Sequence, residues 1–248
     1  MIGGMSAHSR PPKPSHAWYE SQGNLGGRLN SLRAAVLGAN DGIVSVAGLV
    51  IGVAGATSDR QALVVAGLAG LSAGAMSMAV GEYVSVSAQR DSEKGMLAIE
   101  AAELAAMPEA ELRELEGLLG EAGMSEQTAR AAARELTEHD ALAAHARVEL
   151  GIDPSHDRAN PITAALASLG AFIAGGLIPF LAVLFAPHSA AVLVTVIAVV
   201  VALAITGFTS ARLGRAPEGR AVARNIVGGL FAMGVTYLIG NLFGTAIS

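Results

Sequence analysis

The chain has 248 residues, of which 52% are apolar and 15% are charged, and its mean hydropathy is +0.50. An ordinary soluble domain carries about 25% charged residues, so this composition disfavours a soluble enzyme and excludes disorder over most of the chain. The net charge is −5 and no basic patch stands out, which argues against nucleic-acid binding. The lack of cysteine excludes disulfides and thiolate metal sites.

Residues 1–31 are polar and contain three prolines, which predicts a flexible tail without a signal peptide. Five apolar segments follow, each with about the 20 residues that a helix needs to cross a bilayer. They are roughly Leu32–Ala56, Gln61–Ala88, Pro161–Ala186, Ser189–Ala211 and Ala221–Ile247. The predicted fold is therefore an all-α membrane protein with five transmembrane helices. Residues 32–90 hold the first two, an insert occupies 91–158, and residues 159–248 hold the last three.

Glycines in the apolar segments recur at a spacing of four residues. This spacing lets membrane helices approach closely, although glycine is also simply common in this chain. The pairs are Gly38 and Gly42, Gly48 and Gly52, Gly70 and Gly74, and Gly240 and Gly244. Several such pairs in one chain favour tightly packed membrane helices.

Charge divides the chain into two parts. Residues 91–158 hold 16 acidic and 6 basic residues, a net charge of −10, whereas the remainder carries a net charge of +5. With five spans, 15 of the 16 basic residues fall on the same side as the N-terminus and the insert, and only Arg60 falls on the other. Since Lys and Arg favour the cytoplasmic side, we expect a cytoplasmic N-terminus and insert and an outer C-terminus.

The insert is predicted to be a three-helix unit, because Ala, Glu, Leu and Arg dominate it. No proline falls between Gln61 and Met107, so the second span is expected to continue unbroken to Pro108. Pro108 then opens a helix over 109–121. Ser125 is the expected N-cap of a third helix over 125–150, which Gly151 ends.

Two carboxylates lie in apolar surroundings, Asp41 in the first span and Glu82 in the second. Charged side chains inside a membrane are expensive and usually line an ion or proton path, unless they lie near enough to the end of the span to reach water. Met78 lies one turn before Glu82 on the same helix face. A thioether beside carboxylates suits a transition metal, although a membrane methionine is more often a packing residue.

Acidic side chains in the insert also repeat at helical spacing. Glu100 and Glu103 share one helix face, Glu111 and Glu114 share another, and Pro108 turns the chain between them. Clustered carboxylates bind divalent cations, which offset their mutual repulsion. The third helix adds further candidates near one face, namely Glu135, Glu138, His145 and Glu149. A His–Glu pair one turn apart is a workable ligand set for Fe²⁺, Mn²⁺ or Zn²⁺, and the alternative is a solvated acidic face.

The chain contains no nucleophile–base set and no GxSxG, P-loop or HExxH motif, so it is predicted not to be an enzyme.

Two stretches, LRAAVLGANDGIVS at 32–45 and SMAVGEYVSVSAQRD at 77–91, resemble the first two spans of the vacuolar iron transporter (VIT) family. The resemblance covers about residues 30–248. It implies a proton-coupled exporter of Fe²⁺, with other divalent metals possible and no prosthetic group. It also implies a homodimer with the ion pathway between subunits. The compact Ala/Gly/Arg-rich usage favours a prokaryotic-type member, and hence the plasma membrane.

By motif, Asp41 and Met78 fall on the family's pathway ligands, and Glu82 lies beside them. The resemblance places the family's cytoplasmic metal-binding glutamates at Glu100, Glu103, Glu111, Glu114 and Glu149. Members of the family carry a Met pair where this chain has His145 and Ala146. Replacing soft ligands by an imidazole favours Mn²⁺ or Zn²⁺ relative to the family norm.

The sequence therefore predicts a divalent-metal/H⁺ antiporter in contact with lipid, metal ions and protons but not with nucleic acid. The alternatives are a Mn²⁺ or Zn²⁺ exporter and a membrane-anchored metal buffer or sensor that transports nothing.

Overall fold

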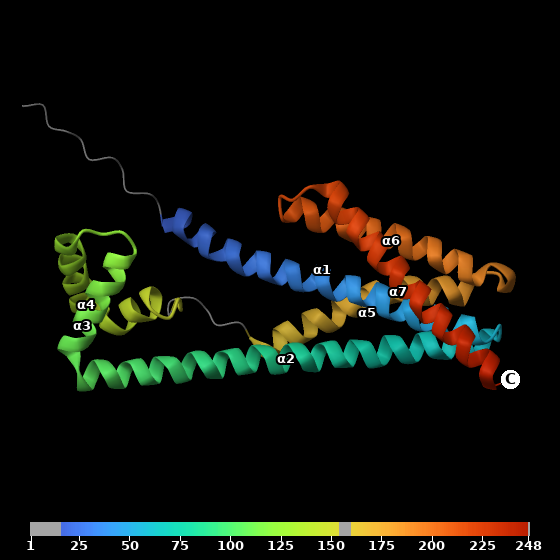
Figure 1. Ribbon diagram of the computed structural model, residues 1–248, viewed down its shortest axis with the longest axis horizontal. Helices are drawn as coiled ribbons and strands as arrows, with labels where there is room; N and C mark the ends of the chain where they lie inside the picture. The colour runs from blue at the N-terminus through green and yellow to red at the C-terminus, as the bar shows by residue number, and fades with distance from the viewer. Residues whose placement is uncertain (1–15, 154–159, 248) are drawn as a thin grey trace, which may run out of the picture.

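The computed structural model describes residues 16–153 and 160–247, and every regular element in these ranges is helical (Figure 1). Its elements are α1 (His16–Ala56), α2 (Arg60–Ala106), α3 (Pro108–Glu121), α4 (Glu126–Val148), α5 (Pro161–Phe185), a short 3₁₀ turn (His188–Ala190), α6 (Ala191–Leu213) and α7 (Glu218–Ile247). Residues 1–15 of the predicted tail and 154–158 of the predicted insert lie outside the described ranges.

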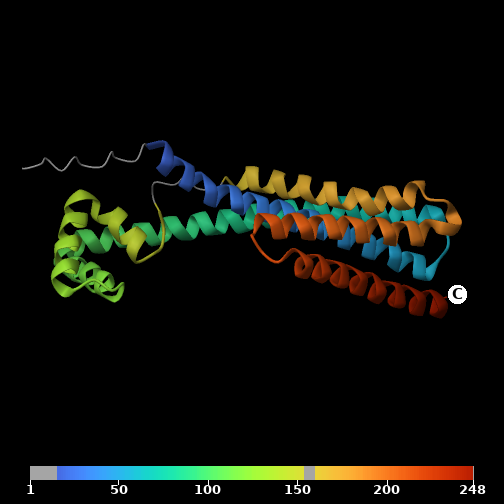
Figure 2. The same cartoon turned by 90° about the horizontal axis from the view of Figure 1, so that it is seen from above.

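The molecule has two lobes joined by one helix. The apolar helices α1, α5, α6 and α7 pack together, and one part of α2 lies against α1 and α5; we call this part of the molecule the membrane lobe. Helices α3 and α4 lie at the far end of α2, as both views show (Figures 1 and 2). Five helices are long and apolar enough to cross a membrane, with windows at Ala35–Ala56, Arg60–Ala106, Pro161–Phe185, Ala191–Leu213 and Glu218–Ala246. The predicted all-α fold is confirmed, and five helices are candidates for the five predicted spans. The exact topology and the side on which the insert lies stay predictions.

Helix α2 extends from the membrane lobe to the insert without a break. It begins at an N-cap, Asp59, whose carboxylate accepts hydrogen bonds from the backbone N–H groups of Gln61 and Ala62. Its 47 residues correspond to about 70 Å. It ends at Ala106, and Met107 separates it from Pro108 at the start of α3. The unbroken helix predicted from the absence of proline is confirmed, and one rigid rod therefore carries both Met78 and Glu100.

Glycines allow α1 to pack backbone against backbone with two other helices. A Cβ atom at Gly175 of α5 would overlap the carbonyl oxygen of Ala39 in α1, and one at Gly42 would overlap that of Phe172. Towards the other end of α1, a Cβ atom at Gly240 of α7 would overlap the carbonyl oxygen of Gly52. The close packing predicted from the glycine spacing is thus confirmed at these crossings, because only hydrogen fits there.

Helix α1 begins at His16, so residues 16–31 are helical, whereas the flexibility expected for residues 1–31 stays a prediction. The last proline of the tail is Pro14, and nothing after it forbids helical geometry. Extending a helix that the span has already nucleated costs far less than starting a new one. The polar composition of this segment therefore did not stop the helix.

The insert has its own small core and capped helices. Pro108 stands in the first turn of α3, and the hydroxyl of Ser125 accepts a hydrogen bond from the N–H of Thr128 at the start of α4. The core consists of Leu115, Leu119, Ala129, Ala133 and Ala144. The predicted insert helices are confirmed to within two residues, but α4 bends at Asp140, where the backbone leaves helical geometry (φ −165°, ψ 92°).

Candidate metal sites in the insert and the membrane lobe

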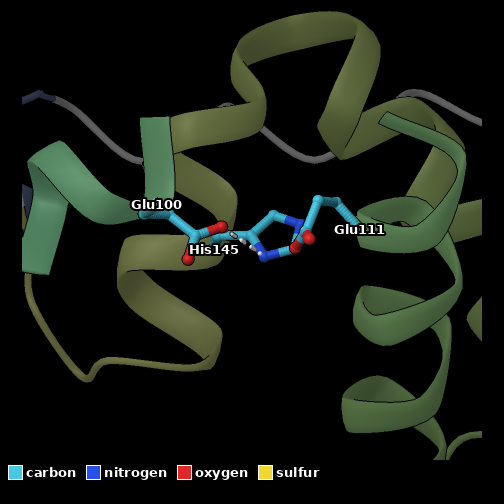
Figure 3. Close-up of side chains that lie close together, drawn as sticks. All are labelled: Glu100, Glu111 and His145. Atoms are coloured by element: carbon cyan, nitrogen blue, oxygen red, sulfur yellow. Dashed lines mark ion pairs between the residues drawn. The ribbon is translucent and has the colours of Figure 1, made fainter. Parts of the chain in front are cut away.

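Three helices of the insert bring two carboxylates and an imidazole together. Glu100 comes from α2, Glu111 from α3 and His145 from α4, and the ligand atoms of the three lie within 4.8 Å of one another (Figure 3). Their exposed fractions are 3%, 6% and 0%. We call this group the insert site. Buried polar side chains that converge in this way are costly unless something pairs with them.

The polar atoms of the insert site are only partly satisfied. His145 Nδ1 lies 2.9 Å from Glu100 Oε1 and 3.2 Å from Glu149 Oε2. One ring nitrogen carries at most one proton, so it cannot donate to both carboxylates. Among the described residues, His145 Nε2 and Glu100 Oε1 have no aligned hydrogen-bond partner. The site therefore offers more lone pairs than protons, which fits a bound cation.

The electrostatics of the insert site also favour a bound cation. Burial raises the pKa of Glu100 above its ordinary value, and Glu149 raises this pKa further while His145 lowers it. Burial is also the main cause that raises the pKa of Glu111, followed by the nearby Glu114. Two carboxyl groups thus become harder to ionise, and a divalent cation would reverse both effects by pairing with the carboxylates.

The other predicted insert ligands lie around this core of three. Glu103 and Glu114 are exposed, and the Glu149 side chain is 29% exposed, yet all three act electrostatically on Glu100 or Glu111. Their role as ligands stays a prediction. Glu135 and Glu138 are exposed and precede the bend of α4, so the single ligand face predicted for the whole third helix is wrong.

A second site lies in the membrane lobe. Asp41 of α1 and Met78 of α2 line a single cavity of about 450 Å³, which we call the membrane cavity. Its further polar lining is Asn40 of α1 together with Arg224 and Asn225 of α7. The Ser45 hydroxyl donates to Asp41 Oδ1 at 2.7 Å. The structure thus brings together Asp41 and Met78, which lie 37 positions apart in the sequence.

Glu82 lies outside the lining of the membrane cavity. It is half-buried and one turn further along α2 than Met78, towards the insert. Sequence reasoning missed Asn40, Arg224 and Asn225 as lining residues. Asn40 belongs to the Ala39–Gly42 stretch already singled out, so its proximity to Asp41 was a usable signal. Arg224 lies in the fifth predicted span, and no local pattern links it to Asp41.

Comparison with known proteins places the chain in a family. The model of the VIT family matches residues 32–241. The chain belongs to the VIT family. It is 42% identical to the vacuolar iron transporter of Acanthamoeba castellanii, over 87% of this chain and 80% of the relative. It is 39% identical to vacuolar iron transporter homolog 5 of Oryza sativa subsp. japonica, over 89% and 84% of the two chains.

A third relative, vacuolar iron transporter homolog 2 of Arabidopsis thaliana, is 36% identical over 88% of this chain and 86% of its own length. Members of the VIT family are transporters, so this VIT-family chain is a multi-pass membrane transporter and not an enzyme. The resemblance stated from the two motif stretches is confirmed, and the matched range includes both the insert site and the membrane cavity.

Proposed function

We propose that this VIT-family protein exports Fe²⁺ from the cytoplasm in exchange for protons. The observation that carries the proposal is the membrane cavity, where a carboxylate and a thioether from two different spans line one space. A charged side chain is expensive in a membrane and usually marks an ion path. The thioether adds a ligand that transition metals accept and that Ca²⁺ and Mg²⁺ do not favour.

The insert is proposed to collect the metal on the cytoplasmic side and pass it along α2. Glu82 lies between the two sites on this helix, so we assign it to the approach to the membrane cavity. Asp41 and Met78 then receive the ion. Glu100, Glu103, Glu111, Glu114, Glu149 and His145 are the proposed metal-binding residues of the insert.

Iron as the cargo rests on the names of the relatives, and the insert site leaves room for other metals. One imidazole and two buried carboxylates form a nitrogen–oxygen ligand set without sulfur. Such a set accepts Fe²⁺, Mn²⁺ and Zn²⁺. Export of Mn²⁺ or Zn²⁺ is therefore the alternative within the same mechanism, and competition between these ions distinguishes them.

Proton coupling follows from the shared use of carboxylates. Metal binds the ionised form, so loading the metal releases protons, and protonation favours its departure. The raised pKa values of Glu100 and Glu111 bring this exchange nearer to neutral pH in the insert. We place the N-terminus and the insert in the cytoplasm and the C-terminus outside, because the basic residues gather with the insert. We also propose that the protein is a homodimer in the plasma membrane. The homodimer is implied by the resemblance to the VIT family, and the plasma membrane by the resemblance to a prokaryotic-type member.

The proposal is tested in proteoliposomes with Fe²⁺ added outside and a pH dye inside. We expect Fe²⁺ entry to drive proton movement in the opposite direction, and Asp41→Asn to abolish both. Asp91→Asn is the matched control, since it removes an exposed carboxylate outside the cavity. Metal flux without proton movement would reject the antiport, and full flux in Asp41→Asn would reject the pathway.

A membrane-anchored buffer or sensor is the second candidate, because the insert site needs no residue of α1, α5, α6 or α7. The double variant Glu100→Gln/His145→Ala separates the two. A transporter keeps flux at saturating metal because its membrane cavity is intact. A buffer loses its metal response entirely and shows no flux in either form.

A further inference from the structure

The membrane cavity contains a fixed positive charge on the same walls as its carboxylate. Arg224 of α7 and Asp41 of α1 both line it, although they come from opposite ends of the chain. Among the described residues, neither side chain forms an ion pair, and the hydrogen bond from Ser45 occupies only Asp41 Oδ1. An arginine is charged at every working pH, so the cavity holds one permanent cation that competes for Asp41.

A second observation shows that the cavity has a vacant acceptor. The Oδ1 atom of Asn40 is buried and has no hydrogen-bond partner among the described residues, and Asn40 belongs to the same lining. Most buried acceptors are paired, so an unpaired one beside a carboxylate calls for a cationic or hydrogen-bonding guest. A volume of about 450 Å³ leaves room for a metal ion with some of its waters or for the guanidinium group, whose side chain can change rotamer.

We infer that Arg224 is a tethered counter-cation, which competes with the metal for Asp41 and thereby lowers the affinity of the membrane cavity for metal. This inference rests on the proposed transport through Asp41. Arg224 is exposed and forms no ion pair with Asp41 in the structure, so its guanidinium reaches the carboxylate only after a change of rotamer. There it competes with the metal and speeds its release. Arg224 is thus a positioning and specificity-determining residue for transport and does not itself bind the metal.

Arg224 would therefore weaken metal binding in the membrane cavity and speed metal release. A conducting site must bind its ion well enough to admit it and weakly enough to let it leave. Without the guanidinium, Asp41, Asn40 and Met78 would hold a divalent ion more tightly. Replacing Arg224 leaves Asp41, Asn40 and Met78 in place, so the effect of the arginine on metal affinity can be measured while the pathway itself is intact.

The test is Mn²⁺ and Fe²⁺ flux in proteoliposomes with Arg224→Gln. We expect KM to fall about two- to fivefold and kcat to fall as well, since removing one nearby charge changes a partly exposed interaction by about this factor. Arg224→Lys keeps the charge and should remain within about twofold of the parent, because a rim charge contributes little through its exact shape. Arg220→Gln is the matched control, because it removes the same charge one turn earlier on α7 and outside the cavity lining.

The outcomes are distinct. An unchanged KM in Arg224→Gln, or the same change in Arg220→Gln, overturns the inference. A rise in KM assigns Arg224 to metal recruitment and also overturns it. Thermal melting in detergent checks that each variant is folded, and rescue by Arg224→Lys excludes a merely structural role. Loss of flux in Asp41→Asn together with a normal KM in Arg224→Gln keeps the proposed transport and rejects only the tethered cation.

Discussion

The insert site and the membrane cavity place carboxylates in opposite circumstances. In the insert, Glu100, Glu111 and His145 are packed together and buried, with Glu103, Glu114 and Glu149 adding negative charge around them. In the membrane lobe, Asp41 lines a cavity of about 450 Å³ that Arg224 also lines. The insert site has more carboxylates than its single imidazole can balance, whereas the membrane cavity is lined by a permanently charged arginine. A metal would balance the excess negative charge of the insert site, but in the membrane cavity it would have to compete with Arg224.

This difference assigns different tasks to the two regions. A crowded site with an excess of carboxylates gains most from binding a metal and is suited to capture. A roomy site with a competing cation is suited to passage, because it does not hold the ion tightly. The rod α2 joins the two sites, so the ion can approach the membrane along one helix.

The largest effect is expected from removing the imidazole of the insert site. His145→Ala should weaken binding of Zn²⁺ or Mn²⁺ to the insert by about 10- to 100-fold, the range seen when residues that support a metal site are lost. Titration calorimetry on the full chain in an Asp41→Asn background measures the insert alone. His139→Ala is the matched control, since His139 lies on the same helix but is exposed. Equal affinities in the two variants would remove His145 from the site.

The effect of pH on stability is expected to be smaller and has a definite sign. Burial raises the pKa of Glu100 and Glu111 above the ordinary 4.5, so the folded protein binds protons more readily than the unfolded one. Without metal, stability should therefore fall as the pH rises from 4.5 through the raised values. A rise of one in the pKa of either carboxyl group corresponds to about 1.4 kcal/mol of lost stability. Thermal melting against pH measures it, and metal at neutral pH should restore the loss.

A Glu100→Gln variant sharpens this test, because it removes the most buried carboxylate of the insert site. Its melting temperature without metal should vary less with pH than that of the parent, and metal should stabilise it less. The exposed Glu135→Gln serves as the control. If the parent protein without metal becomes steadily more stable as the pH rises from 4.5 to 7, the pKa values of Glu100 and Glu111 are not raised in the folded state.

The ends of α2 and α4 were predictable from the sequence, because prolines and N-cap residues act on the backbone next to them. The absence of proline up to Pro108 predicted the unbroken α2, and the cap at Ser125 predicted the start of α4. The bend at Asp140 escaped prediction because an aspartate occurs in helices as well as at caps. Here its carboxylate accepts a hydrogen bond from the N–H of Ala143, and it starts a new helical segment that carries His145.

Sites were predictable only where one helix or one turn determined them. Glu100 and Glu111 flank Pro108, so the turn of the chain there was enough to bring their helices together. The membrane cavity needed more. Arg224 reaches it through the packing of α7 against α1, and this contact joins residues more than 180 positions apart. No helical period contains such information, because it arises from the backbone contacts that the glycines of α1 and α7 allow.

The smallest effect is expected at Glu82, which lies between the two regions and belongs to neither lining. A carboxylate on the approach to the membrane cavity attracts the ion but is not required to bind it. We therefore expect Glu82→Gln to raise the KM for Fe²⁺ by about twofold or less and to leave kcat unchanged, because the charge is partly exposed and screened by salt. Flux at 0.05 M and 0.3 M salt checks the reason, since screening should erase the difference between Glu82→Gln and the parent. A loss of kcat as severe as that of Asp41→Asn would instead place Glu82 in the pathway itself. The membrane cavity would then extend one turn along α2 towards the insert.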